Sequence, residues 1–214
     1  MVRHLLEAMA SKLDSEFFRT VRHLGFRHHS AYSASEAIQL LGLCTEVINF
    51  QCDFGFADPT ALLPLLTKMR IRRLVVNLER LFGAGPADPA HQLFAHVTHD
   101  MEPRVELLPA VPLLPAFTHL AVCWDSPWER LLSPLAECPR LQLLLVKFAP
   151  DSYDLDEESR APYAYDVRFV IGRCADYWAD WEVGVRGGSD LWVEGDEFVE
   201  RKRAGEIETT RYWL

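Results

Sequence analysis

A six-residue pattern, apolar-x-x-apolar-x-apolar, recurs along most of this chain and constrains its fold more than any other feature. The clearest copy is Phe117-Thr118-His119-Leu120-Ala121-Val122. In an extended strand the fourth and sixth residues point to one face and can be buried together, while the residue between them points to the other face. The remaining clear copies are Val21/Leu24/Phe26, Ile71/Leu74/Val76 and Cys138/Leu141/Leu143.

Three weaker copies complete the series. Two of them carry a polar residue, Asn49 or His99, at the last apolar position. The weaker copies are Cys44/Val47/Asn49, Phe94/Val97/His99 and Asp166/Phe169/Ile171. The middle positions are then 24, 47, 74, 97, 120, 141 and 169, at separations of 21 to 28 residues. A near-constant period of this length is typical of leucine-rich repeats.

Helix signals lie between the predicted strands. A capping residue followed by proline marks helix starts at Asp58-Pro59, Asp88-Pro89 and Ser126-Pro127. Pro64 and Pro134 within the predicted helices indicate that these helices are short or kinked. We therefore predict one domain over residues 1–214, an α/β leucine-rich-repeat-like solenoid with one curved parallel sheet of about seven strands and short helices on its convex side.

Helical caps are expected at both ends of the repeats, which are predicted to span residues 19–172. Apolar residues at helical spacing predict a cap helix over residues 1–18. Residues 173–214 read as two helices separated by Gly187-Gly188, and we expect them to cap the other end. Their aromatic content leaves a ligand-binding aromatic box open as an alternative. The residues concerned are Tyr177, Trp178, Trp181, Leu191, Trp192 and Phe198.

Charge and cysteine content restrict the class of protein. A net charge of -9 disfavours a nucleic-acid binder, because such proteins normally carry a basic excess. The five cysteines show no disulfide or zinc spacing, so we expect a reducing compartment, the cytoplasm or the nucleus. No window approaches the roughly 20 apolar residues of a membrane span, and we expect no membrane partner.

The chain resembles the leucine-rich-repeat, often F-box-associated, proteins that are expanded in mushroom-forming fungi. The likeness covers roughly residues 17–207 and is carried by 117–122, by 137–142 and above all by the ending from Asp176-Tyr177-Trp178 to Arg201-Lys202-Arg203. It implies a repeat scaffold and a substrate-receptor role in ubiquitin ligation. Fewer residues precede Val21 than an F-box needs. The hypothesis is therefore a truncated receptor, in which residues 1–18 would bind the adaptor protein.

Non-core positions of the strands form the concave, ligand-binding face of a repeat stack. The residue before each middle position gives one predicted column: His23, Glu46, Arg73, His96, His119, Arg140 and Arg168. Six of the seven are Arg or His, stacked about 4.8 Å apart. Our hypothesis is a non-enzymatic protein–protein interaction scaffold that binds an acidic partner surface through this column. The alternative, pairing with local carboxylates or with the acidic loop at 151–158, stays open.

A second function left open is an enzyme of unknown reaction with a site near the centre of the sheet. Its candidate residues are His96, His119, Asp100 and Cys123, of which at least two would have to lie within hydrogen-bond reach in a pocket. The sequence contains no hydrolase, metalloprotease, P-loop or dinucleotide motif, so we expect no cofactor. His96 and His99 would lie on opposite faces of a regular strand, and we expect no metal site there.

Overall fold

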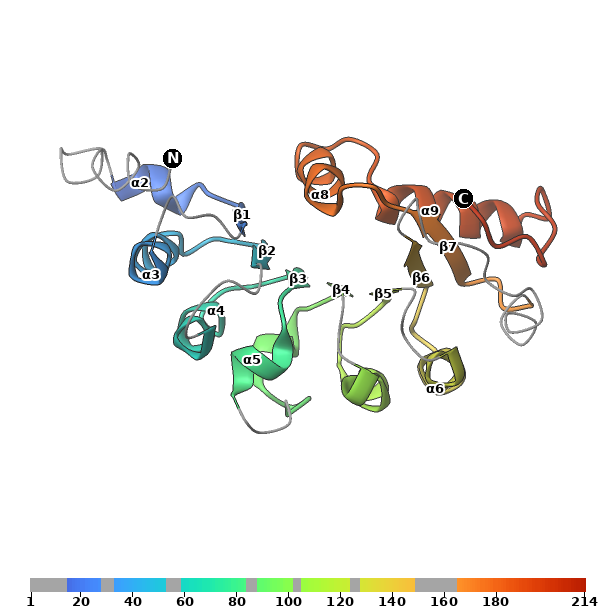
Figure 1. The fold of residues 1–214 in the computed structure, drawn as a ribbon, viewed down its shortest axis with the longest axis horizontal. Coiled ribbons are helices and arrows are strands. Elements are labelled where there is room, and N and C mark those ends of the chain that lie inside the picture. Colours follow the sequence, from blue (N-terminus) through green and yellow to red (C-terminus); the bar gives the residue numbers. More distant parts are fainter. Residues whose placement is uncertain are drawn as a thin grey trace. The chain divides into compact units, whose positions relative to one another are not determined.

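The computed structural model describes residues 15–27, 33–52, 59–83, 88–101, 105–123, 128–148 and 165–214. The described strands form one open sheet of seven parallel strands, and their order in the sheet is their order in the chain (Figure 1). Helices alternate with the strands, so the predicted α/β class is confirmed. The strands are β1 (His23–Phe26), β2 (Asn49–Cys52), β3 (Arg73–Val75), β4 (His99–Met101), β5 (His119–Cys123), β6 (Leu143–Phe148) and β7 (Phe169–Arg173).

The connections between successive strands are short helices, as the internal prolines predicted. Two connections contain a four-residue 3₁₀ turn, and a third is 3₁₀ over nine residues that include Pro109 and Pro112, each of which lacks a backbone donor. The helices are α2 (Ser15–Arg19), α3 (Ala34–Leu43), η1 (Pro59–Leu62), α4 (Leu63–Leu66), α5 (Leu78–Phe82), η2 (Gln92–Ala95), η3 (Val105–Leu113), α6 (Trp128–Glu137), α8 (Tyr177–Val185) and α9 (Leu191–Arg203). None of the described helices is long and apolar enough to cross a membrane.

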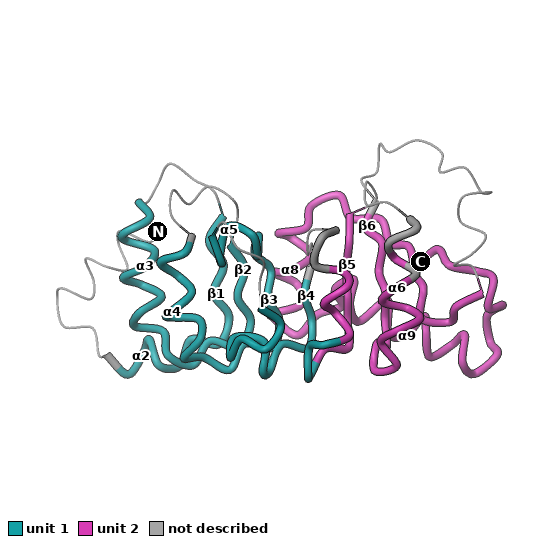
Figure 2. Tube along the Cα trace, turned by 90° about the horizontal axis from the view of Figure 1, so that it is seen from below, with its two compact units in different colours: residues 1–100, 113–116 teal, residues 101–112, 117–214 magenta. Residues whose placement is uncertain are grey.

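The chain divides into two compact units, coloured separately in Figure 2. Unit 1 contains residues 1–100 and 113–116, and its helices α3, α4 and α5 lie on one side of β1 to β4 (Figure 1). Leu41, Phe50 and Leu74 are fully buried between the strands and these helices. Helix α3 begins at a capping box in which Ser33 Oγ accepts from Glu36 N and Glu36 Oε2 accepts from Ser33 N.

Unit 2 contains residues 101–112 and 117–214, and its strands are covered on both faces. Helix α6 lies on one side, while α9 packs on the opposite face of β6 and β7 (Figure 1). Leu143 and Leu144 are neighbours in β6 with side chains on opposite faces, and both are fully buried. Lys202 of α9 is buried and donates from Nζ to the carbonyl oxygen of Phe169 in β7, 3.0 Å away.

The outer edge of β7 is covered by the segment Tyr212 to Leu214. Ile171 N donates to Tyr212 O at 2.6 Å, and Leu214 N donates to Ile171 O at 3.0 Å. These bonds form a parallel bridge between Ile171 and Trp213. The backbone N–H and carbonyl groups of Ile171, at the centre of the β7 edge, are thereby paired and are not open to edge-to-edge pairing.

The strand register corrects the predicted repeat phase at three repeats. Leu24 pairs with Phe50, Leu74 with Asp100, and Leu120 with Leu144. The middle residues are therefore Phe50, Asp100 and Leu144, and the prediction of Val47, Val97 and Leu141 was wrong by three residues. In two of these segments apolar residues recur every third position, at 44, 47 and 50 and at 138, 141 and 144, so the pattern fits at either of two phases. In the third segment the register-matched residue is Asp100, a polar residue that the apolar pattern excluded.

The predicted ends of the chain are partly described. Helix α2 begins at Ser15, and residues 1–14 of the predicted N-terminal cap helix lie outside the described residues, as does the acidic loop at 151–158. The two helices expected in 173–214 are present as α8 and α9, with Asp176 and Asp190 as their N-caps. The single domain over residues 1–214 stays a prediction.

Candidate functional site

Four polar side chains lie side by side on the strands of unit 1. The register aligns His23, Asn49, Arg73 and His99, one from each of β1 to β4, and we call these four residues the polar strip. Three of them precede a buried residue of their strand, namely Phe50, Leu74 or Asp100, so the side chains of the strip point to the opposite face. That face is the one turned away from α3, α4 and α5 (Figure 1). Three members of the strip are half-buried, and Asn49 is 8% exposed.

Hydrogen bonds fix the imidazoles of the strip. Asn49 Nδ2 donates to His23 Nδ1 at 2.9 Å, which requires an unprotonated Nδ1. Burial, and then the nearby charge of Arg73, lower the pKa of His23 below its ordinary value. At the other end, His99 Nδ1 lies 2.8 Å from Thr98 Oγ1. Arg73 is thus the fixed cation of the strip, flanked by an amide and an imidazole.

A second row of residues follows on the same face, two positions further along each strand. The register aligns Gly25, Gln51 and Val75. Gln51 is only 2% exposed, and its Oε1 atom is buried without a hydrogen-bond partner among the described residues. A buried amide oxygen in this state costs free energy, because it has lost water and gained nothing in return.

Two residues of the predicted column in unit 1 lie elsewhere. Glu46 and His96 are exposed and precede their strands by three residues. Glu46 forms an ion pair with Arg22, with 2.8 Å between Oε2 and Nη1. The predicted column was wrong at both positions because of the three-residue phase error, and Asn49 and His99 occupy the places assigned to them.

In unit 2 the equivalent face is occupied by α9. His119 starts β5, is 6% exposed, and its Nε2 lies 2.9 Å from Asp196 Oδ1 of α9. Its ring also meets Trp192 edge-on, with 5.9 Å between the ring centroids. His119 is therefore paired with a carboxylate of α9, 77 residues away in sequence.

Arg140 is exposed and does not belong to the column. Its Nη2 atom donates to Pro112 O at 3.2 Å, and the register places Leu143 beside His119 instead. Leu143 packs against Gly195 of α9: a Cβ atom at position 195 would stand 2.7 Å from Leu143 Cδ2. The prediction that Arg140 belongs to the column was wrong because of the same three-residue phase error.

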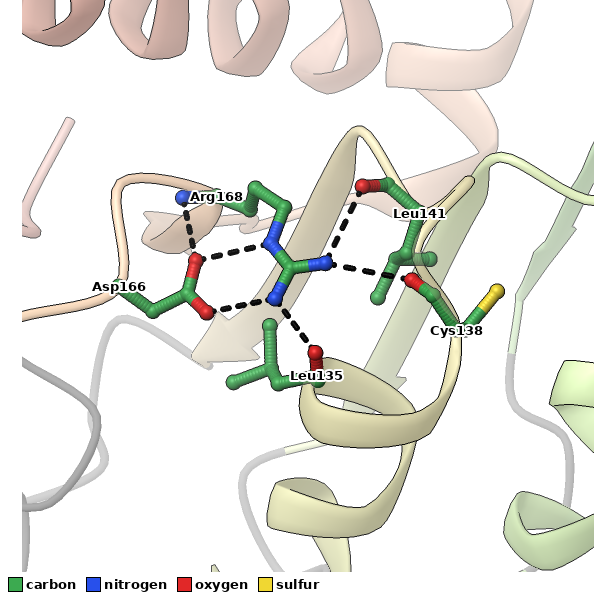
Figure 3. Close-up of polar contacts among 5 residues, drawn as sticks. All are labelled: Leu135, Cys138, Leu141, Asp166 and Arg168. Atoms are coloured by element: carbon green, nitrogen blue, oxygen red, sulfur yellow. Dashed lines mark hydrogen bonds and ion pairs between the residues drawn. The ribbon is translucent and has the colours of Figure 1, made fainter.

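Arg168 serves the interior of unit 2 rather than its surface (Figure 3). Nε and Nη2 contact the two oxygens of Asp166 at 2.9 and 2.7 Å. The other N–H groups point to main-chain carbonyl oxygens, those of Cys138 at 3.2 Å, of Leu141 at 3.5 Å and of Leu135. A guanidinium has five N–H donors, and these contacts use all five. Burial would raise the pKa of Asp166, but the hydrogen bonds and charge of Arg168 outweigh it and hold that pKa below its usual value.

The residues proposed for an enzymatic site are separated within each unit. In unit 1, His96 is exposed while Asp100 is buried in β4. In unit 2, His119 and Cys123 are the first and last residues of β5, about 13 Å apart at 3.3 Å per residue. His119 does contact both Thr118 and Asp196. The adjacent threonine–histidine contact recurs at Thr98 and His99, so it follows from the local geometry of this dipeptide.

Sequence reasoning missed Asn49, Gln51 and His99. The signal for the first and the last was present, since Asn49 and His99 appeared as polar defects at an apolar position. When the predicted phase of these two copies is shifted by three residues, Asn49 and His99 fall at the positions of the polar strip. No sequence pattern distinguished Gln51.

Cys44 and Cys138 are buried, as the sequence predicted for core cysteines. Burial raises the pKa of Cys44 to about 11.

Comparison with known proteins identifies no relative: no family model, no curated protein and no solved structure matches the chain. Among the described residues, no group of three or more His, Cys, Asp or Glu side chains could hold a metal ion. The geometry of the polar strip therefore carries the functional argument.

Proposed function

We propose that this protein is a non-enzymatic binding scaffold whose polar strip binds a carboxylate-bearing segment of a partner protein. The observation that carries the proposal is the register of β1 to β4, which aligns His23, Asn49, Arg73 and His99 on the face opposite the helices of unit 1. Extended ligands commonly bind such a row of strand residues in repeat proteins.

We further propose that the fold is a leucine-rich-repeat-like solenoid. Register-matched residues recur at 24, 50, 74 and 100 in unit 1, and at 120, 144 and 169 in unit 2. The separation within each unit is 24 to 26 residues, more regular than the sequence pattern alone indicated. Each period contains one short strand and one short helix, the unit that repeat proteins stack.

Charge favours an acidic partner. Arg73 is permanently protonated and offers a planar fork of donors that matches a carboxylate. His23 is uncharged near neutral pH because burial and Arg73 lower its pKa, so it adds hydrogen-bonding capacity without a second positive charge. A permanent positive charge on Arg73 beside the uncharged His23 and the amide of Asn49 fits a single carboxylate better than a polyanion.

A peptide-display selection with the purified protein tests this function. We expect the selected peptides to be enriched in Asp or Glu, and we expect Arg73→Glu to abolish the enrichment. Arg72→Glu is the matched control: Arg72 is exposed and adjacent in sequence but outside the strip, so its reversal should leave the enrichment intact. Unchanged selection with Arg73→Glu, or the absence of acidic enrichment with the wild type, would contradict the proposal.

A further inference from the structure

Gln51 is the group on the strip's face that the proposed function leaves unexplained. Its side chain is 2% exposed, and its Oε1 accepts no hydrogen bond among the described residues. Buried amide oxygens in folded proteins are almost always paired, and an unpaired one costs as much as a lost hydrogen bond. Gly25 of β1 is aligned with Gln51, and because it is a glycine it places no side chain next to that of Gln51. Glycine inside a strand often marks a place where another backbone approaches closely.

We infer that the polar strip binds an extended peptide whose main-chain N–H donates to Gln51 Oε1 while an acidic side chain of the same peptide binds Arg73. This inference rests on the proposed function and specifies its ligand. Gln51 is aligned with Val75, two residues beyond Arg73 in β3. Diagonal neighbours of this kind lie about 7–8 Å apart between Cα atoms. One residue of an extended peptide spans about 3.3 Å, and an acidic side chain reaches further, so one or two peptide residues bridge both groups.

The two contacts have different roles. Arg73 recognises the carboxylate and gives the site its charge selectivity. Gln51 recognises a group that every peptide residue except proline carries, so it selects for main chain in a defined position rather than for a side chain. A free dicarboxylic acid supplies the first contact but not the second. The ligand class is therefore an acidic peptide, and not a small organic acid.

The test uses the tightest acidic peptide from the selection described above, labelled with a fluorophore, and the full chain. Each peptide amide is N-methylated in turn, which removes one N–H donor at a time. We expect one methylated position to weaken binding about tenfold, the loss typical of a buried hydrogen bond. Gln51→Met should weaken the unmodified peptide by a similar factor. It should bind the sensitive N-methylated peptide as well as the wild type does, because both changes remove the same bond.

A second measurement separates binding from folding. Gln51→Met removes an unsatisfied buried acceptor at nearly the same volume, so the Tm of the free protein should stay constant or rise. A fall in Tm with unchanged peptide affinity would show a structural role for Gln51 and overturn the inference. If Arg73→Glu abolishes binding but no N-methylated peptide and no Gln51 variant differs, the binding function stands and the main-chain contact is refuted. If no acidic peptide binds, both fail.

Discussion

Arg168 and Asp166 form a two-point ion pair, with Nε to Oδ1 at 2.9 Å and Nη2 to Oδ2 at 2.7 Å. The same guanidinium donates to carbonyl oxygens at the end of α6 and in the turn that leads to β6. Helix ends leave carbonyl groups without intrahelical partners, and these need a donor. A side chain just before β7 thus pairs with carbonyl groups at the end of α6, and we expect α6 and β7 to unfold together.

Replacing Arg168 by lysine should destabilise unit 2 strongly although the charge is kept. An ammonium group has at most three donors and no planar fork, so at least two of the five contacts are lost and buried acceptors remain unpaired. We expect a loss of about 2–4 kcal/mol in the free energy of unfolding, measured by urea denaturation. The control is Arg186→Lys on α8, where the exposed arginine has only a 3.5 Å contact with Glu182. That change should cost less than about 0.5 kcal/mol, and equal losses for the two variants would refute the structural role of Arg168.

Two helical glycines should respond in opposite directions to alanine. At position 195 in α9 an added Cβ meets Leu143 Cδ2 at 2.7 Å, and Leu143 is fully buried. Overpacking there should cost about 1–3 kcal/mol. At position 42 in α3 the added atom meets nothing within 4 Å, and alanine should stabilise the helix by about 0.5–1 kcal/mol. Thermal denaturation of Gly195→Ala and Gly42→Ala measures both, and a stabilised Gly195→Ala would contradict the packing of α9 on β6.

The class of fold could be predicted from the sequence because buried apolar residues recur at each strand. Leu74 and Leu120 are fully buried in their strands, as the pattern predicted, whereas Leu24 is only half-buried. The phase failed where apolar residues recur every third position, because Val47 and Phe50 are both fully buried and the pattern weighs them equally. What decides between them is which backbone groups join the ladder, a property of neighbouring strands that no local pattern contains.

The candidate site was predictable only in part, for a related reason. His23 and Arg73 lie where the pattern placed them, since the phase of their repeats was correct. Arg168 and His119 were counted as surface groups, yet their partners lie far away in sequence. Asp196 is 77 residues from His119, and Leu135 is 33 residues from Arg168. The partner of a polar side chain depends on such long-range packing, so residue type alone did not distinguish a binding residue from a structural one.

His23 should make the stability of unit 1 depend on pH. Its folded pKa is lowered below 6.5 by burial and by Arg73, so the folded state disfavours the protonated ring, which can no longer accept from Asn49. This contribution to stability is present above about pH 6.5 and is lost as the pH falls through the folded pKa. Urea denaturation should show a smaller loss between about pH 7.5 and pH 5 for His23→Gln than for the wild type. The exposed His96→Gln should behave as the wild type, and an identical slope for His23→Gln would disprove the assignment.

Asp180, at the junction of α8 and α9, should give the stability of unit 2 the opposite dependence on pH from that of His23. The pKa of Asp180 is raised to about 6, chiefly by burial and further by the negative charges of Asp190 and Glu194. Two effects lower it in part: the N–H of Leu191, at the start of α9, donates to Oδ1 at 3.0 Å, and Lys147 is positively charged. A raised carboxyl pKa means that the folded state prefers the protonated form, so this contribution to stability is present below about pH 4 and is lost as the pH rises through about 6.

Asp180→Asn keeps an acceptor for Leu191 and removes the charge. It should raise the Tm by about 2–4 °C at neutral pH and by progressively less toward acid pH, in differential scanning calorimetry. Glu182→Gln, an exposed carboxylate on the same helix, controls for the loss of one negative charge and should show no such trend. A Tm difference between Asp180→Asn and the wild type that stayed constant with pH would mean that Asp180 is not protonated near pH 6.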